Sequence, residues 1–257
     1  MKSKDTLADG RFVLVCPSGK GAKAEVWKAV DRQEGGKAVA LKCCAEESWA
    51  VAEYNSGLSF SHECLLKPTG LFGSVISMPL YEGRALDGIC GYLTEEKAWQ
   101  VLRDVASALA YLHGRGICHD AVSPNNILWS GERFILSGLE HCHAGSSTPG
   151  DVWALAASVF RMVMGRPVFG GAEGRTQLPD SPLPFMRKSM PELSRLIARC
   201  LEYRPEKRPT AQEIRETAVA QTAALSSREY PRPLKSKETA TPVTDSRFWP
   251  DEMKEIV

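Results

Sequence analysis

The segment over 93–136 restricts the fold of this chain more than any other stretch. It begins with Thr94 followed by two glutamates, the pattern of a capped helix start whose acidic first turn favours the helix dipole. Apolar side chains then recur at helical spacing, at Trp99, Val101, Leu102, Val105, Leu109 and Leu112. A polar loop over 116–126 follows, and the apolar runs 127–129 and 134–136 flank a turn. The segment therefore predicts a long helix, a polar loop and a short hairpin.

The N-terminal part has the pattern of two strands joined by a glycine-rich turn. Residues 11–17 read as a strand, and Gly19 and Gly21 precede a second run that contains Val26. Glycine lets backbone N–H groups approach an anion closely, so this turn suits a loop that folds over phosphates. Taken alone, the same residues fit an ordinary hairpin turn at least as well.

A lysine and a glutamate follow in elements of different kinds. Lys42 ends the β-prone run 37–42, and Glu53 lies in a segment of helical character. Two apolar runs, 65–68 and 74–78, then predict strands around a turn. Each charge alone fits an exposed surface position, but their order after the glycine-rich turn favours a Lys–Glu pair.

These features occur in the order found in protein kinases. The motifs are Gly19-Lys20-Gly21 with Val26, Val39-Ala40-Leu41-Lys42, Glu53, the loop from His119 to Asn126, Asp151-Val152-Trp153-Ala154-Leu155, and Arg199-Cys200-Leu201 followed by Arg208-Pro209-Thr210. They correspond to G-x-G-x-x-G-x-V, V-A-I-K, the helix Glu, H-R-D-L-x-x-x-N, D-x-W-x-x-G and the last helices of that family. Over residues 11–217 the chain resembles eukaryotic-type, serine/threonine-like protein kinases.

The resemblance implies an α+β fold with two lobes. A small, β-rich N-lobe with one helix and the hinge is expected over 1–83, and a larger helical C-lobe over 84–222. Residues 223–257 are rich in Ser, Pro, Lys and Thr, and they are expected to form a flexible or loosely docked tail.

The resemblance also implies a slot for ATP or ADP. Val26, Ala40 and Leu128 are expected around the adenine, Pro79 and Tyr81 at the hinge, and Gly19, Gly21, Lys42, Glu53 and Asn126 around the phosphates and metal. The third glycine of the phosphate loop is replaced by Ala24, which favours weak binding.

The departures from the family remove the groups that phosphoryl transfer requires. The family's catalytic Asp aligns with Ala121, its magnesium Asp with Ser137, and its loop Lys with Ser123. Only residues 140–150 separate the hairpin region from Asp151, which leaves little chain for an activation segment. Because the reaction depends on bound metal and a positioned carboxylate, Mg²⁺ is not expected to bind in the usual way.

We therefore predict a pseudokinase that binds ATP or ADP and acts as a scaffold or allosteric regulator of a protein partner. One alternative is a divergent active kinase that uses Asp120 or Glu140, or that transfers a different group from ATP. A second alternative is an interaction module without a nucleotide. A zinc site at Glu140-His141-Cys142-His143 with Cys118 and His119 is disfavoured, because structural zinc needs four well-placed ligands. The sequence predicts neither catalytic residues nor a metal site.

Composition excludes several other classes. A formal net charge of +1 gives no reason to expect nucleic acid as a partner. The N-terminus lacks an apolar signal sequence, and the apolar stretch 152–164 is too short to span a bilayer. The eight cysteines lack the spacing of a disulfide scaffold. We expect a cytoplasmic protein with reduced thiols and no transmembrane segment.

Overall fold

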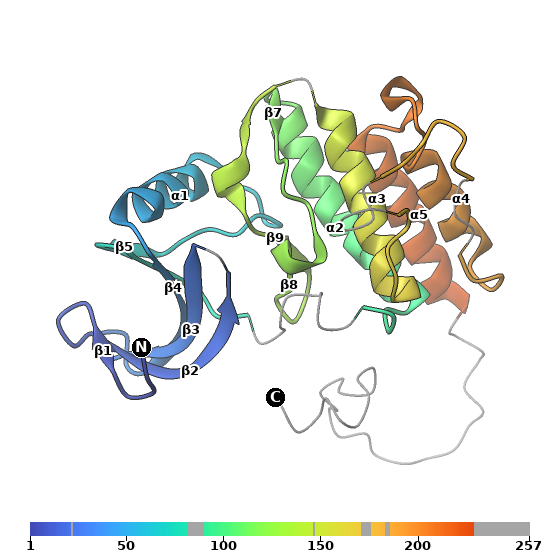
Figure 1. The fold of residues 1–257 in the computed structure, drawn as a ribbon. Helices are drawn as coiled ribbons and strands as arrows, with labels where there is room; N and C mark the ends of the chain where they lie inside the picture. The colour runs from blue at the N-terminus through green and yellow to red at the C-terminus, as the bar shows by residue number, and fades with distance from the viewer. Residues whose placement is uncertain (22, 82–89, 146, 171–175, 183–185, 229–257) are drawn as a thin grey trace, which may run out of the picture.

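A curled antiparallel sheet with one helix forms one end of the molecule, and packed helices form the other (Figure 1). This computed structural model describes residues 1–21, 23–81, 90–145, 147–170, 176–182 and 186–228. Residues 82–89, which include the end of the expected hinge and the start of the expected C-lobe, and residues 229–257 of the expected tail lie outside the described residues. The mixed α and β composition agrees with the expected fold class.

The sheet has six strands, each antiparallel to its neighbours. They are β1 (Thr6–Leu7), β2 (Phe12–Lys20), β3 (Ala24–Asp31), β4 (Lys37–Cys44), β5 (Gly70–Phe72) and β6 (Val75–Pro79). Their order is β1-β2-β3-β4-β6-β5. Side chains alternate between the faces of a strand, and both faces of this sheet are apolar. One face buries Leu14 and Leu41, and the other buries Ala40 and Ile76.

Two sequence assignments in this region need correction. The strand preceding β6 is β5, and not the run 65–68. Gly73, with φ +57°, lies in the turn between β5 and β6. Leu65 instead forms an isolated parallel bridge with Leu136, and it packs in the helical core. The first strand of the glycine-rich hairpin is also longer than predicted, since β2 includes Gly19.

The helices are α1 (Glu47–Ser59), α2 (Glu95–His113), α3 (Thr148–Met164), α4 (Pro191–Cys200) and α5 (Ala211–Arg228). The predicted cap of α2 is confirmed, because Thr94 Oγ1 accepts a hydrogen bond from Lys97 N at 3.3 Å. At α5, Thr210 Oγ1 accepts from Glu213 N, and Glu213 accepts from Thr210 N, which is a capping box. Helix α5 continues past residue 222, where the tail was expected to begin.

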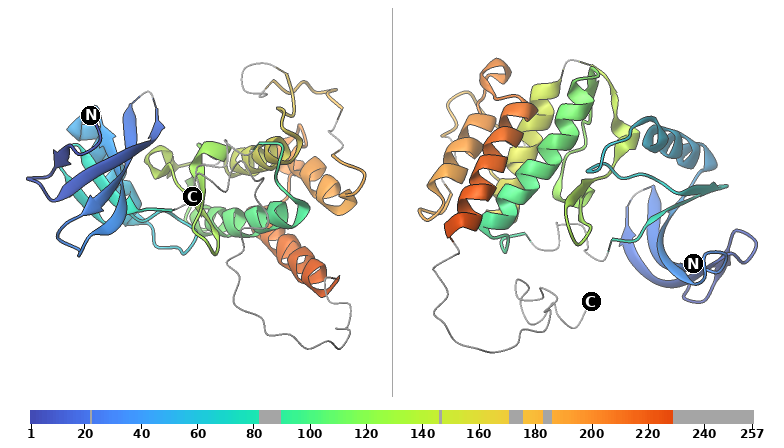
Figure 2. Two further views of the ribbon diagram at one scale, coloured as in Figure 1. Left: turned by 90° about the horizontal axis from the view of Figure 1, so that it is seen from below. Right: turned by 180° about the vertical axis from the view of Figure 1, so that it is seen from behind.

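The core of the helical end surrounds α2. In this helix Trp99, Leu102, Leu109 and Leu112 are at most 1% exposed. Helix α5 runs beside α2, and α3 packs on another side (Figure 2). None of the helices in the described part of the chain is long and apolar enough to cross a membrane.

Short elements connect the sheet to the helices. They are β7 (Ile117–Cys118), the 3₁₀ turn Pro124–Asn126, β8 (Ile127–Trp129), β9 (Phe134–Leu136), the 3₁₀ turn Leu139–His141 and β10 (His143–Ala144). The predicted hairpin is confirmed by the antiparallel pairing of β8 with β9. Strand β10 pairs with β7, and this brings residues 143–144 back to the polar loop.

Candidate functional site

Three of the predicted site residues lie on neighbouring positions of the sheet. Val26 in β3 is directly opposite Gly19 in β2 on one side and Lys42 in β4 on the other. Ala40 lies two residues before Lys42 and therefore on the same face of β4. This face carries the small apolar cluster that includes Ala40, Ile76 and α1 residue Ala50, with Val26 packed against it. The register thus brings Lys42 next to an apolar surface and to the glycine-rich hairpin.

Lys42 forms the centre of an ion cluster. Its Nζ lies 2.5 Å from Glu53 Oε2 and 2.6 Å from Glu53 Oε1. A second carboxylate, Glu140, approaches from a segment 98 residues away in sequence, with Oε1 at 3.1 Å from Nζ. The side chains are 21%, 17% and 27% exposed for Lys42, Glu53 and Glu140, so the cluster is partly shielded from water. The predicted Lys–Glu pair is present, and Glu140 is an additional member.

The pKa values in this cluster follow from burial and mutual charge. Burial lowers the pKa of Lys42, but the two carboxylates outweigh it and the net shift is upward. Burial raises the pKa of Glu53, and the charge of Glu140 raises it further against the opposing effect of Lys42. Burial also raises the pKa of Glu140, but Lys42 outweighs it and the net shift is downward. Two carboxylates that share one ammonium cannot both gain fully from it.

Local backbone geometry puts Glu140 in this position. Gly138 adopts the left-handed conformation, with φ +86° and ψ +32°, and begins the 3₁₀ turn Leu139–His141. Leu139 is 4% exposed and belongs to the helical core. Cys142 N donates to Leu139 O at 3.1 Å and closes the turn. A buried side chain on one side and a sharp turn on the other direct Glu140 toward α1, which carries Glu53.

The polar loop is held by Asp151 at the start of α3. Asp151 is 1% exposed, and it accepts hydrogen bonds from the backbone N–H groups of His119 and Asp120, both at 2.8 Å. It also pairs with His113 Nε2 at 2.9 Å. Burial raises the pKa of Asp151, but the bonds from His113 and the two N–H groups outweigh it and lower the pKa overall. These bonds hold Asp120 at φ +56°, a conformation uncommon for residues other than glycine.

Asn126 is also fixed by the loop itself. Its Nδ2 donates to Ala121 O at 2.7 Å. Ser137 returns to the same residue through its backbone N–H and its hydroxyl, which both donate to Asn126 O, at 2.8 and 3.2 Å. Ala121 and Ser137, which were expected to align with the family's two carboxylates, therefore both contact Asn126.

Position 138, and not Ser137, faces the side chain of Asn126. In protein kinases the loop Asn and the carboxylate after the hairpin hold metal ions at the same phosphates, so the two side chains must face each other. A Cβ placed on Gly138 would lie 2.7 Å from Asn126 Nδ2, whereas the Ser137 hydroxyl is turned to the Asn126 backbone. A carboxylate facing the Asn126 amide would therefore come from position 138, which is glycine.

The two residues weighed as substitute bases lie in different places. Asp120 Oδ2 lies 3.3 Å from His143 Nδ1, and both side chains are exposed. Glu140 is engaged with Lys42 in the ion cluster. The structure thus separates the two candidates, one at the outer side of the polar loop and one beside α1.

The remaining predicted residues lie at or just beyond the ends of strands β2 and β6 and in the β8–β9 hairpin. Pro79 ends β6 opposite Val39, and Tyr81 is half-buried, so its pKa is raised by burial. Leu128 lies in β8 opposite Ile135 and is half-buried. Gly21 lies just past β2, where its N–H donates to Ala24 O at 2.9 Å.

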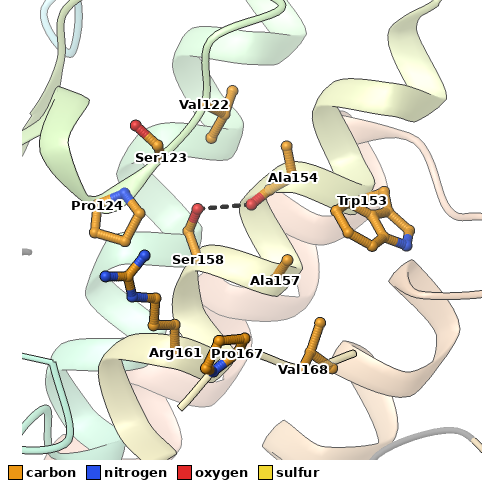
Figure 3. A pocket seen from close by; sticks show the side chains of 10 residues that line it. All are labelled: Val122, Ser123, Pro124, Trp153, Ala154, Ala157, Ser158, Arg161, Pro167 and Val168. Atoms are coloured by element: carbon orange, nitrogen blue, oxygen red, sulfur yellow. Dashed lines mark hydrogen bonds between the residues drawn. The ribbon is translucent and has the colours of Figure 1, made fainter. Parts of the chain in front are cut away.

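Cavities occur at two places near these residues. A cavity of about 20 Å³ borders the ion cluster at Glu53, and it is also lined by Gly57, Met78, Gly138 and Leu139, among others. A hollow of about 60 Å³ lies between loop residues 122–124 and α3, where Trp153 and Arg161 border it (Figure 3). The lining residues that the structure describes include neither a carboxylate nor an imidazole.

In the described part of the chain, the side chains that could bind a metal do not form a cluster. Among the residues described, no three His, Cys, Asp or Glu side chains gather around a common point. Burial raises the pKa of the Cys142 thiol to about 12, which disfavours the thiolate that zinc binds.

We expect His119 to make the stability of the fold depend on pH. Its Nε2 is 3.1 Å from Ser137 O and its Nδ1 accepts from Ala121 N at 3.2 Å, which fits the neutral ring. Burial lowers the pKa of His119 below 6.5, against the opposing effect of Asp151. The unfolded chain therefore takes up a proton first as the pH falls below about 6.5, and the free energy of unfolding decreases by up to about 1.4 kcal/mol per pH unit.

We expect denaturant titrations between pH 7.5 and about 5 to show this decrease. His119→Gln should reduce the slope, since it removes the titrating group. An unchanged slope in His119→Gln would contradict the assignment, and the remaining slope would then be attributed to His62, whose pKa burial also lowers.

Comparison with known proteins supports the resemblance to protein kinases that the motifs indicate. No protein-family model matches the chain. Serine/threonine-protein kinase PkaA of Streptomyces coelicolor is 26% identical over 263 residues, which cover 79% of this chain and 48% of that protein. Serine/threonine-protein kinase pkn2 of Myxococcus xanthus is 26% identical over 88% of this chain and 34% of its own length. Calcium/calmodulin-dependent protein kinase cmkB of Emericella nidulans is 26% identical over 61% of this chain and 50% of its own length.

These similarities support a protein-kinase-like chain. The chain spans half or less of the length of these relatives, so the similarity concerns a part of each relative and not its whole length.

The sequence analysis did not predict the structural roles of Asp151 and Glu140. For Asp151 the available signal was a charged residue directly before the apolar run 152–164. For Glu140 the sequence offered no signal beyond its charge.

Proposed function

We propose that this chain is a two-lobed, protein-kinase-like domain that binds an adenine nucleotide without transferring its phosphate. The observation that carries the proposal is the Lys42–Glu53 pair at 2.5 Å on the same sheet face as Val26 and Ala40. In protein kinases such a pair aims the Lys at the α- and β-phosphates. An apolar surface beside a cation suits a ligand with a flat base and an anionic group.

The missing carboxylates support the loss of transfer. Position 121 is alanine and position 138 is glycine, so neither a base nor a metal ligand stands beside Asn126 in the family's arrangement. Phosphoryl transfer depends on positioned charge far more than on covalent chemistry. A site without those two carboxylates keeps a ligand and leaves it intact.

A ligand held in this way would act as a regulator. It would contact both the sheet and the loop that carries Asn126, and it would therefore favour one arrangement of the two ends of the molecule over others. Through that arrangement the domain would serve as a scaffold or allosteric partner of another protein.

Thermal unfolding with and without ligand tests nucleotide binding. At ten times the dissociation constant, ATP or ADP should stabilise the protein by about 1.4 kcal/mol and raise its Tm by roughly 3–6 °C, with little dependence on Mg²⁺. Lys42→Ala should abolish the shift, and Lys188→Ala, which removes an exposed lysine elsewhere, should retain it. The absence of any shift in the wild type would favour an interaction module without nucleotide.

A divergent kinase remains a second candidate because Asp120 carries an exposed carboxylate 3.3 Å from His143, an arrangement compatible with a base. Steady release of ADP in the presence of ATP, Mg²⁺ and a generic protein substrate would establish it if Asp120→Ala removed the activity. We expect the wild type and Asp120→Ala to be equally inactive.

A further inference from the structure

The side chain of Glu140 occupies a position at Lys42 that a phosphate group would need. We propose that Glu140 is a built-in competitor for phosphate, so that the slot selects adenine ligands with few or no phosphates over ATP. This inference rests on the proposed nucleotide slot and defines which ligand that slot prefers.

The first argument concerns the donors of Lys42. An ammonium group has three N–H donors. Both oxygens of Glu53 lie within 2.6 Å of Nζ, and Glu140 Oε1 lies 3.1 Å from it. An incoming phosphate oxygen is also only an acceptor, so it would have to displace one carboxylate. Glu140 forms the longer contact and has the more exposed side chain, so it is the one to be displaced.

The second argument concerns charge. With all three groups ionised, the cluster of Lys42, Glu53 and Glu140 has a formal charge of −1. His141 Nε2 lies 3.9 Å from Glu140 Oε1 and would add a positive charge only when protonated. With Lys42, Glu53 and Glu140 ionised, a polyphosphate would approach a cluster of its own sign, and like charges at this range repel. A nucleoside has no such penalty.

The third argument concerns direction. Glu53 reaches Lys42 from α1, whereas Glu140 belongs to the turn that starts at Gly138, beside the Asn126 amide. In Figure 1 this yellow-green segment lies next to α1, between the sheet and the helices. Glu140 thus comes to Lys42 from the side of Asn126, and the space between Lys42 and Asn126 is where the family holds phosphates and metal.

Calorimetric binding of adenosine, ADP and ATP, without Mg²⁺ and with EDTA, tests the selection. The wild type should bind adenosine at least as tightly as ATP. Glu140→Gln, which keeps the shape and removes the charge, should bind ATP about tenfold more tightly and adenosine within twofold of the wild type. Glu132→Gln removes an exposed carboxylate elsewhere and should change neither. Equal changes for adenosine and ATP, or weaker ATP binding in Glu140→Gln, would overturn the inference.

A measurement that needs no adenine separates this inference from the proposed function. Acetic anhydride acylates lysines, and tripolyphosphate protects a lysine to which it binds. Tripolyphosphate should leave the acylation rate of Lys42 in the wild type unchanged but slow it severalfold in Glu140→Gln, with exposed Lys188 as the internal reference. Equal protection in both proteins, or none in Glu140→Gln, contradicts competition by Glu140. Competition in this assay with no binding of adenosine or ATP to any variant would instead refute the nucleotide slot alone.

Discussion

Replacing Asp151 by alanine is expected to lower the free energy of unfolding by about 3–5 kcal/mol, the cost typical of removing one partner from a buried charged network. Two buried backbone N–H groups, of His119 and Asp120, would lose their acceptor, and His113 would lose its partner. Chemical denaturation followed by circular dichroism at pH 7.5 measures the change.

The effect should extend to the loop. Asp120 is held at φ +56° by these bonds, and such conformations cost about 1–3 kcal/mol unless the surroundings impose them. Without Asp151 the loop is free to relax, and the bond from Asn126 to Ala121 O should weaken with it. Hydrogen exchange at Asp120 and Ala121 should therefore rise by more than the global loss of stability explains.

Two further variants serve as controls for Asp151→Ala. Asp180→Ala removes an exposed carboxylate and should change stability by less than about 0.5 kcal/mol. Asp151→Asn keeps the shape and one acceptor, and it should fold with a smaller loss, which protects the test if the alanine variant does not fold. A loss below about 1 kcal/mol for Asp151→Ala would show that the loop does not depend on this network.

Local patterns predicted much of the fold. The capped start of α2 and the β8–β9 hairpin follow from residues close in sequence, because caps and tight turns are formed by neighbouring groups. The run 65–68 was assigned as a strand because it is mostly apolar, but Leu65 is buried in the helical core and Leu66 packs against the cluster that contains Ala40 and Ile76. Periodicity cannot distinguish a short buried strand from an apolar segment that packs without a sheet.

The candidate site was only partly predictable for a related reason. The Lys42–Glu53 pair was predicted from the order of the motifs along the chain, although the two residues belong to different elements. Glu140 lies 98 residues from Lys42, and its position depends on the left-handed turn at Gly138 and on the burial of Leu139. The same turn makes Gly138, one residue after Ser137, the position that faces Asn126. Sequence spacing contains no information on which of two adjacent side chains a turn will present.

Leu139 links stability to the ion cluster, and Leu139→Ala is expected to cost about 3–4 kcal/mol, within the range for buried leucines. The side chain is 4% exposed and already borders the cavity of about 20 Å³ between Gly57 and Gly138. Deleting it would enlarge that cavity, and neighbouring groups have little scope to fill it. A Cβ on Gly57 would lie 2.6 Å from the Pro68 ring, which shows how closely this ring approaches the backbone of α1.

Denaturant unfolding of Leu139→Ala measures the cost, with Leu139→Met as the variant that nearly conserves volume and should lose less than about 1.5 kcal/mol. Leu178→Ala, at a side chain 62% exposed, should be nearly neutral. Because Leu139 anchors the turn that presents Glu140, its removal should also allow tripolyphosphate to protect Lys42 from acylation. A large loss of stability without any change in that protection would mean that Glu140 is held by Lys42 itself and not by the turn.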